Sequence, residues 1–335
     1  MSCWYNDKAK DDDIAVSTRI RLARNIAGVP FPSRMTDEQK TAVNEQVKKA
    51  IIESNTPYAK SLKFLLMKDI PENERYSMIE RHIISPEFVK KSENGAIILS
   101  DDESISIMIG EEDHIRIQVI LAGLQLEKAY DIAENLDTLI CDSLNIAFDS
   151  QLGFLTECPT NLGTGLRASV MLHLPITESA GEMSGLAESV NKIGFVFRGM
   201  YGEGSKAIAS LYQLSNQITL GISEKNAIDN LKIITMQLTQ KERKLRESIN
   251  KLKVEDMCMR AVGTLKYARI ISSEEMMKLL SEVKLGMALG VLESNINPIK
   301  LLIEGQPYML MRQFGIMSPD ERDIYRANLV RNSFS

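Results

Sequence analysis

Stretches in which polar and apolar residues alternate along the chain predict β-strands that bury one face. In the first of these stretches, Ile20 and Leu22 share one face while Arg19 and Arg21 share the other. The turn-forming residues 101–103 (DDE) separate two such stretches and predict a hairpin. The predicted strands are VSTRIRLA (16–23), GAIILS (95–100), SISIMIG (104–110), HIRIQVIL (114–121), GLRASVMLHLP (165–175) and KIGFVFRG (192–199).

Helical stretches lie between these strands, notably over residues 124–147 and 223–250. Strands that are joined by tight turns and interrupted by long helices are typical of a mainly antiparallel sheet with helices on one face. The sequence therefore predicts an α+β fold for the larger part of the chain.

Beyond Lys253 the pattern changes, and only helices punctuated by glycine and proline are expected. Ser272 to Glu275 and Ser318 to Glu321 both have the spacing of a capping box, the second with proline at the first helical position. We therefore predict two domains, residues 1–250 with the sheet and residues 251–335 with helices alone.

The composition limits the classes of protein to consider. The chain has 335 residues and a formal net charge of −5, so it has no overall attraction for nucleic acid or an anionic membrane. It has no apolar run of ~20 residues and no N-terminal signal pattern, which favours the cytoplasm. Because the cysteines lack C-x-x-C pairing and only three histidines are present, neither a zinc site nor a disulfide framework is expected. The cysteines are Cys3, Cys141, Cys158 and Cys258.

Five arginines occur on the polar faces or at the ends of predicted strands. They are Arg19, Arg21, Arg116, Arg167 and Arg198. Each one alone is typical of a solvated strand face. If the strands share a sheet, however, the guanidinium groups converge, and such a cluster is stable only around several negative charges. A triphosphate would supply those charges.

Carboxylates and a thiol are the remaining candidates for chemistry. Glu111, Glu112 and Asp113 form a turn just before Arg116, where they are either simply solvated or able to orient a cationic nucleophile. Glu203 lies in the glycine-rich segment RGMYGEG, and Cys158 precedes a proline. A free cysteine is more often buried filler than a reactive group.

Other phosphate-binding signatures do not fit. The chain contains no G-x-x-x-x-G-K-[ST] motif, which excludes a P-loop motif. Gly163 to Ala168 formally match G-x-G-x-x-A, but the residues that follow alternate like a strand instead of opening a helix. A dinucleotide site is therefore not expected.

The same residues resemble the phosphagen (ATP:guanido) kinase superfamily, most closely its bacterial protein-arginine kinase branch. Creatine- and arginine-type members carry a small helical domain before the first motif, whereas about sixteen residues precede it here and a helical extension follows. The resemblance implies a phosphagen-kinase-like antiparallel sheet flanked by helices. The matching segments are STRIRLARN (17–25), RHIISPEF (81–88), EEDHIRIQ (111–118), CPTNLGTGLRASV (158–170) and RGMYGEGS (198–205).

The resemblance implies that ATP is the phosphoryl donor and that Mg²⁺ accompanies it. Because no dedicated cage of protein ligands is evident, the metal is expected to be held largely by the nucleotide and water. The residues implied for the nucleotide are Ser17, Thr18, Arg19, Ile20, Arg21, His82, Arg116, Arg167, Ala168, Ser169, Val170, Met171, Arg198, Gly199, Met200, Tyr201, Gly202 and Glu203.

For catalysis, the resemblance assigns Glu112 to orienting and deprotonating the acceptor guanidinium, with Glu111 and Glu203 nearby. It places Cys158 beside that guanidinium. One departure is visible, because Gly110 stands where the family commonly has asparagine. A looser catalytic turn is one expected consequence.

The segment RDIYRA places Arg322 and Arg326 one helical turn apart. The pattern fits an ordinary amphipathic helix with Ile324 inward, but the segment also resembles the family's R-D-x-x-R-A motif for allosteric phosphoarginine binding. The implied allosteric residues are Arg322, Asp323, Arg326 and Ala327.

The resemblance implies a protein-arginine kinase that marks proteins for Clp-type degradation, acts in protein quality control and the stress response, and forms a homo-oligomer, a dimer. Its implied partners are arginine-containing substrates such as a heat-shock repressor, a zinc-binding activator protein and a Clp ATPase or protease. An active site without an N-terminal cap domain would suit a protein substrate. Two alternatives remain: a small-molecule guanidino (arginine) kinase, and a non-catalytic adaptor that binds arginine or phosphoarginine.

Overall fold

The structure is a computed structural model that describes residues 3–7, 9, 11–54, 56, 58–90, 92–199 and 208–334. The predicted site residues Met200, Tyr201, Gly202 and Glu203 lie outside the described residues. Gly199 is the last residue described before that gap.

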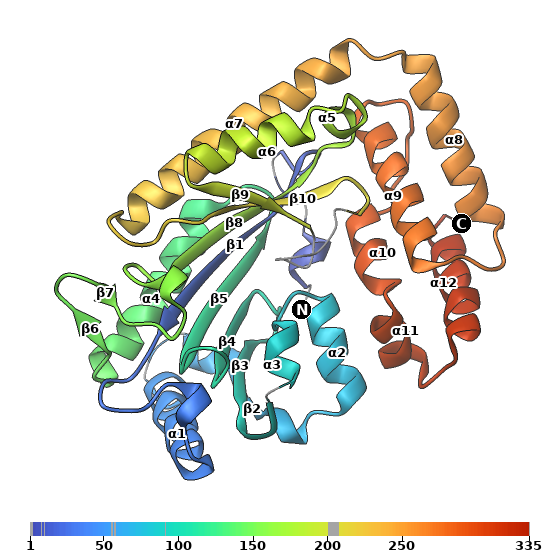
Figure 1. Ribbon diagram of the computed structural model, residues 1–335. Coiled ribbons are helices and arrows are strands. Elements are labelled where there is room, and N and C mark those ends of the chain that lie inside the picture. The colour runs from blue at the N-terminus through green and yellow to red at the C-terminus, as the bar shows by residue number, and fades with distance from the viewer. Residues whose placement is uncertain are drawn as a thin grey trace.

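An eight-stranded sheet forms the centre of the larger part of the chain (Figure 1). Its strand order is β2-β3-β4-β5-β1-β8-β10-β9, and every neighbouring pair is antiparallel. The predicted antiparallel sheet and the hairpin of β3 and β4 are therefore confirmed. The strands are β1 Ala15–Arg24, β2 Leu62–Leu66, β3 Ala96–Ser100, β4 Ile105–Ile109, β5 Ile115–Ala122, β8 Leu166–His173, β9 Phe195–Arg198 and β10 Leu211–Asn216, with a separate ribbon of β6 Phe148–Asp149 and β7 Gly153–Phe154.

The central strand β1 has the alternation that the sequence predicts. Ile20 and Leu22 are buried in the main hydrophobic core, together with apolar side chains from four helices. These helices are α1 Asp37–Ile52, α4 Leu126–Ser143, α6 Met183–Lys192 and α7 Glu224–Glu247. One face of the sheet is thus covered by long helices, and the opposite face is left to present the polar side chains of β1.

The opposite face is also partly covered, which the expectation of helices on one face did not include. At the β3 and β4 end, Ile97 and Met108 pack against Met78 and Phe88. The helices there are α2 Glu72–Glu80 and α3 Pro86–Lys90. All five residues of β4 are buried. Burial on both faces agrees with its nearly continuous apolar sequence.

The C-terminal region is helical, as predicted, and lies at one end of the sheet (orange to red in Figure 1). Its core includes Met276 and Leu302 and also takes in Val16 and Leu211 from the sheet. The predicted capping serines Ser272 and Ser318 both accept the expected backbone hydrogen bond. The helices are α8 Lys251–Tyr267, α9 Ser273–Ala288, α10 Pro298–Glu304, α11 Pro307–Phe314 and α12 Pro319–Ser333.

None of the described helices is long and apolar enough to cross a membrane.

The predicted domain boundary near residue 250 falls between α7 and α8. The remaining elements are α5 Pro175–Ser179 and the 3-10 helices η1 Trp4–Asn6, η2 Pro32–Arg34, η3 Tyr58–Ser61, η4 Met67–Asp69, η5 Ser92–Asn94 and η6 Pro159–Asn161.

Candidate active site

The antiparallel register brings the predicted arginines together. A cavity of about 260 Å³ on the polar face of the sheet is lined by Arg19, Arg21, Arg116 and Arg198. Arg19 and Arg21 come from alternate positions of β1, Arg116 from β5, and Arg198 from the end of β9. We call these four side chains the arginine cradle. Their convergence is the arrangement that the sequence predicts for a polyanion site.

Arg167 lies beside the cradle but is held by the protein. It is directly opposite Arg21 in the pairing of β1 with β8. Its Nε donates to Oδ1 of Asn161 at 3.0 Å, and its Nη1 donates to the carbonyl of Asn216 at 2.9 Å. Arg167 therefore adds positive charge at the edge of the cradle, while its donors fix the neighbouring loops.

The two β1 arginines of the cradle are electrostatically unfavourable without an anion, whereas Arg116 pairs with Glu111. Burial, together with the charges of Arg116 and Arg198, lowers the pKa of Arg19 to about 10. Burial also lowers the pKa of Arg21 well below its usual range, and Arg19, Arg116 and Arg167 add to the effect. The buried Nε of Arg21 also has no hydrogen-bond partner among the described residues. An anion in the cavity would relieve the repulsion and supply the missing acceptor.

His82 and Gln213 link the cradle to a second, apolar cavity. Both residues line the two cavities, and the apolar one is also lined by Met171 and Trp4. Burial, with help from Arg19, lowers the pKa of His82 to about 3, so its imidazole is neutral at physiological pH. The apolar cavity has a volume of only about 20 Å³, so a nucleobase fits beside the neutral ring at its mouth and not inside it.

A carboxylate turn closes the other end of the cradle. Glu111 is buried, pairs with Arg116 and accepts a hydrogen bond from Ser85 at 2.5 Å. Burial opposes ionisation of Glu111, but Arg116 and Ser85 outweigh it and lower its pKa. Glu112 is half-buried and accepts from Nδ2 of Asn161 at 3.4 Å. Glu111 thus anchors the turn, and Glu112 is left at the cavity edge.

Gly110 begins this turn in the left-handed region, with φ of 79°. Its N–H donates to the carbonyl of His114 at 3.0 Å. Asp113 accepts hydrogen bonds from Nδ2 of Asn25 at 2.6 Å and from the backbone N–H of Glu157 at 2.8 Å. The turn is therefore tied at several points, and the expectation that Gly110 loosens it finds no support in these contacts.

A further cavity of about 520 Å³ lies beyond the turn. It is lined by Glu111, Glu112, Glu157 and Cys158, among other residues. Glu111 and Glu112 line both this cavity and the arginine cradle, so they form the partition between them. One side of the partition is cationic and the other is acidic, an arrangement suited to an anionic donor and a cationic acceptor.

Three residues at the site were not singled out in the sequence. Glu157 lines the acidic cavity, Asn161 bridges Arg167 and Glu112, and Gln213 accepts from Nη2 of Arg19 at 2.9 Å. Glu157 and Asn161 flank or fall inside the segment CPTNLGT, so their position beside Cys158 was the available signal. Gln213 lies on β10, a strand without a sequence prediction.

In the strands that the resemblance assigns to the nucleotide, successive side chains face alternately the core and the cavities. Thr18, Ile20, Ala168 and Val170 point away from the cavities and are fully buried. Thr18 donates to the carbonyl of Gly123 at 2.7 Å, and the other three belong to the main core. Their side chains are structural, so a contact of these four residues with the nucleotide would come from the backbone. The side chains on the cavity face are Ser17, Arg19, Arg21, Arg167, Ser169 and Met171.

The RDIYRA segment lies on α12, and its two arginines differ. Arg326 is 1% exposed, and it donates to the carbonyls of Gly305 at 2.7 Å and Ile271 at 2.9 Å and pairs with Asp323. Arg322 is half-buried. Arg326 and Asp323 are thus engaged with the fold, Ala327 is buried, and half-buried Arg322 is the more accessible of the two cations.

Comparison with known protein families accounts for nearly the whole chain. The ATP:guanido phosphotransferase C-terminal catalytic domain matches residues 42–245, and the protein-arginine kinase McsB C-terminal domain matches residues 251–335. A protein-arginine kinase of Caldanaerobacter subterraneus is 43% identical over 96% of both chains. Another, from Halalkalibacterium halodurans, is 42% identical over 99% of this chain and 94% of its own.

Solved structures show the same fold at low sequence identity. A lombricine kinase has a TM-score of 0.63 and 22% identity over 72% of this chain and 70% of its own. A duplicated taurocyamine kinase from Schistosoma mansoni has a TM-score of 0.63 and 24% identity over 76% of this chain and 38% of its own. The predicted phosphagen-kinase-like fold is confirmed, and the chain is a guanido phosphotransferase of a kinase family whose donor is ATP. From its sequence, fold and relatives together, the chain belongs to the ATP:guanido phosphotransferase family and, within it, to the protein-arginine kinases.

Proposed function

We propose that this enzyme transfers the γ-phosphoryl group of ATP to the guanidinium of arginine side chains in proteins. The observation that carries the proposal is the partition formed by Glu111 and Glu112 between the arginine cradle and the acidic cavity. The choice of acceptor is supported by relatives that are named protein-arginine kinase and align with this chain over nearly their whole length.

On the donor side, the triphosphate lies in the arginine cradle and the base lies against the apolar cavity beside His82. Arg19, Arg21, Arg116 and Arg198 bind the phosphate oxygens and stabilise the charge that spreads over the transferred group. Their side chains come from strands of one sheet, so their positions are set before the nucleotide binds.

Mg²⁺ would neutralise phosphate charge when bound with the nucleotide. The described residues contain no group of three or more His, Cys, Asp or Glu side chains placed to hold a metal. We propose that nucleotide oxygens and water supply most of its coordination, as they commonly do for Mg²⁺ bound to substrate phosphates.

On the acceptor side, a guanidinium has a pKa above ~12 and is a poor nucleophile until it loses a proton. Glu112 lies on the partition, where it aligns the guanidinium and accepts this proton. Asn161 keeps the Glu112 carboxylate in place, while Glu111 is occupied by Arg116. Glu157 and Cys158 face the incoming side chain from the acidic cavity.

The proposal is tested by offering the enzyme free arginine and an unfolded arginine-rich protein with ATP. Mass spectrometry under non-acidic conditions, which preserves the phosphorus–nitrogen bond, then locates the phosphate. We expect phosphate on protein arginines. Phosphorylation of free arginine alone would favour a small-molecule kinase, and an absence of transfer to either would favour an adaptor.

Replacing Glu157 by glutamine is expected to raise the KM for the arginine acceptor while leaving the KM for ATP unchanged. The substitution removes one negative charge from the acidic cavity but touches no cradle residue. Steady-state kinetics with each substrate varied in turn would measure this effect. Asp149, an acid on the β6 ribbon that does not line the acidic cavity, provides the matched control Asp149→Asn. An unchanged acceptor KM would show that Glu157 does not contact the acceptor.

We also propose that phosphoarginine binds at Arg322 and changes activity or assembly. Arg322 and Arg326 both act electrostatically on buried Glu80 of the larger domain, which places the RDIYRA segment at the contact between the two parts of the chain. Dimer formation, a zinc-binding activator, a heat-shock repressor as substrate and delivery to a Clp protease stay predictions.

The two arginines of this segment are expected to respond differently to substitution. Arg322→Ala should abolish phosphoarginine binding and leave the melting temperature nearly unchanged. Arg326→Ala should lower stability by about 3–5 kcal/mol, because its buried partners lose their donor and Asp323 loses its counterion. Calorimetric titration with phosphoarginine and thermal melts would separate the effects. Tight phosphoarginine binding by Arg322→Ala would exclude this site.

A further inference from the structure

Glu80 connects the C-terminal helices to the end of α2, two residues before His82. Its side chain is 8% exposed and reaches the first turn of α11. One carboxylate oxygen accepts from the backbone N–H of Tyr308 at 3.1 Å, and the other accepts from Met309 at 2.7 Å. Glu80 thus supplies the N-terminal cap that α11 lacks within its own sequence.

The charges around Glu80 come from both parts of the chain. Burial raises the pKa of Glu80 to about 7, while the N–H groups of Tyr308 and Met309 and the charges of Arg322 and Arg326 act to lower it. An anion bound at Arg322 would weaken that stabilisation of the Glu80 carboxylate. The charge on Glu80 is therefore sensitive to occupancy of the RDIYRA segment.

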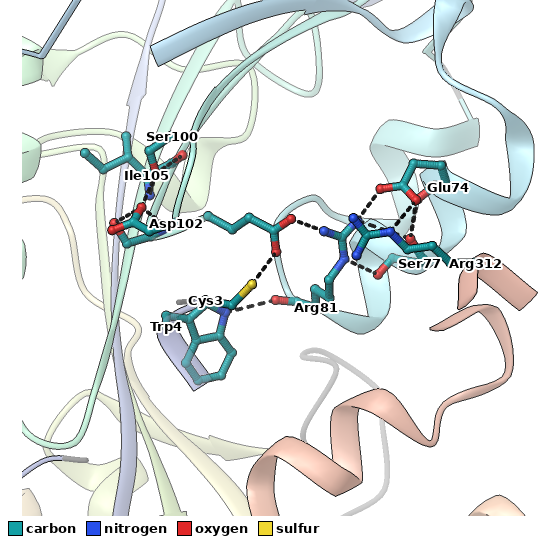
Figure 2. A network of polar contacts seen from close by, with 11 residues as sticks. Cys3, Trp4, Glu74, Ser77, Arg81, Ser100, Asp102, Ile105 and Arg312 are labelled. Carbon is teal, nitrogen blue, oxygen red and sulfur yellow. Dashed lines mark hydrogen bonds and ion pairs between the residues drawn. The ribbon is translucent and has the colours of Figure 1, made fainter. Parts of the chain in front are cut away.

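The backbone on the other side of Glu80 is held at successive residues. Nε1 of Trp4 donates to the carbonyl of Arg81 at 3.3 Å (Figure 2). Nε2 of Gln118 donates to the carbonyls of His82 at 2.8 Å and Ile83 at 3.0 Å. His82 itself has a left-handed φ of 62°, which only a well-fixed neighbourhood sustains. A shift at Glu80 would therefore be felt at His82.

Additional contacts fix this junction. The rings of Tyr76 and Tyr308 are stacked, with centroids 4.6 Å apart. Figure 2 shows Glu74 between Arg81 and Arg312, and Nε of Arg312 lies 2.9 Å from the Glu74 carboxylate. These contacts keep α2 and α11 together, so the Glu80 bonds act between rigid elements.

Trp4 provides a parallel contact with the C-terminal helices. Its ring packs against Ile303 of α10 and Met309 of α11 and lies 6.3 Å from the ring of His82. Trp4, His82 and Ile303 all line the apolar cavity that adjoins the arginine cradle. The C-terminal helices therefore form part of the wall against which the proposed base would lie.

We propose that Glu80 is a positioning residue that fixes His82 through the cap on α11, so that nucleotide affinity depends on the C-terminal helices. The dependence on Arg322 rests on the proposed phosphoarginine site. The dependence on Glu80 itself does not: it follows from the contacts of α2 with α11 and rests on the proposed place of the nucleotide beside His82.

Glu80→Gln and Glu80→Ala in the full-length enzyme are expected to weaken ADP binding, measured by calorimetry, by roughly 2- to 30-fold, the range found for residues that lie between coupled sites. The KM for the arginine acceptor should not change, because no Glu80 contact reaches the acidic cavity. Glu72→Gln, an exposed acid at the start of the same helix, is the control. If the alanine variant fails to fold, the isosteric glutamine variant decides.

A second titration tests the link to Arg322. Phosphoarginine is expected to change the ADP affinity of the wild type but not that of Glu80→Gln, although both bind it. Failure of phosphoarginine to bind the wild type would overturn the regulatory site alone, and the ADP comparison would still decide the role of Glu80. The proposal would be overturned if folded Glu80→Gln bound ADP as tightly as the wild type does. It would also be overturned if the KM for the acceptor rose by the same factor by which ADP binding weakened.

Discussion

Replacing Glu112 by glutamine is expected to reduce phosphoryl transfer by roughly 10²- to 10⁴-fold, the usual contribution of a general base. Glutamine fills the same space and can still accept from Asn161, but it cannot take the guanidinium proton. The cradle arginines are not altered, so ADP binding should be little changed. Single-turnover transfer to an arginine-containing protein and calorimetric ADP titration would measure the two effects.

Two controls make this prediction specific. Glu134→Gln, at an exposed position on α4, should behave like the wild type. Glu111→Gln should also impair the enzyme, but through loss of its pairing with Arg116, so ADP binding should change as well. Near-normal transfer by Glu112→Gln would show that another group removes the proton.

Arg21→Met is expected to lower phosphoryl transfer by roughly 10³-fold or more, in line with the contribution of a transition-state arginine in other phosphoryl-transfer enzymes. The same change should stabilise the nucleotide-free protein. Arg21 is half-buried near the charges of Arg19, Arg116 and Arg167, and its buried Nε has no partner among the described residues. Removing its charge should raise the melting temperature by about 2–4 °C per kcal/mol of relieved repulsion.

Thermal melts with and without ADP would test this trade-off between stability and activity. The melting temperature of the wild type should rise with ADP concentration. The melting temperature of Arg21→Met should be higher than that of the wild type without ADP and should rise less when ADP is added. Arg34→Met, an exposed position in η2, is the control and should change neither quantity. A lower melting temperature for Arg21→Met without nucleotide would mean that the arginine supports the fold.

The sequence predicted the arginine cradle because strand alternation is a local property. Arg19 and Arg21 are two residues apart on a strand with apolar neighbours, so their common face follows from the period of two. The antiparallel pairing that brings in Arg116 and Arg198 needed only the assumption of one sheet. The sequence did not predict strand β10, and it therefore missed Gln213, which lines both the cradle and the apolar cavity.

Features that depend on contacts between distant segments could not be predicted in the same way. The spacing of Arg322 and Arg326 shows that they share a helix face, but not what covers it. Arg326 is a buried structural residue because it donates to the carbonyls of Gly305 and Ile271. These two residues lie 21 and 55 positions before Arg326 in the sequence. Glu80 is a similar case, because its partners are backbone groups of α11.

The sequence also did not predict that helices α2 and α3 cover part of the polar face of the sheet, because this packing too depends on contacts between distant segments. The strands β3 and β4 are apolar along nearly their whole length, which indicates burial on two sides but does not identify the second cover. Helices α2 and α3 supply it, and α2 then delivers His82 to the cavity. The site is thus built partly by local pattern and partly by packing that only the folded chain reveals.

The most direct test of the proposed mechanism is a crystal structure of the enzyme with ADP, Mg²⁺, nitrate as a planar phosphoryl mimic, and an arginine-containing peptide. We expect the ADP phosphates to lie among Arg19, Arg21, Arg116 and Arg198, with the acceptor guanidinium hydrogen-bonded to Glu112 from the acidic cavity. Phosphates bound away from these arginines, or an acceptor that approaches without contacting Glu112, would contradict it.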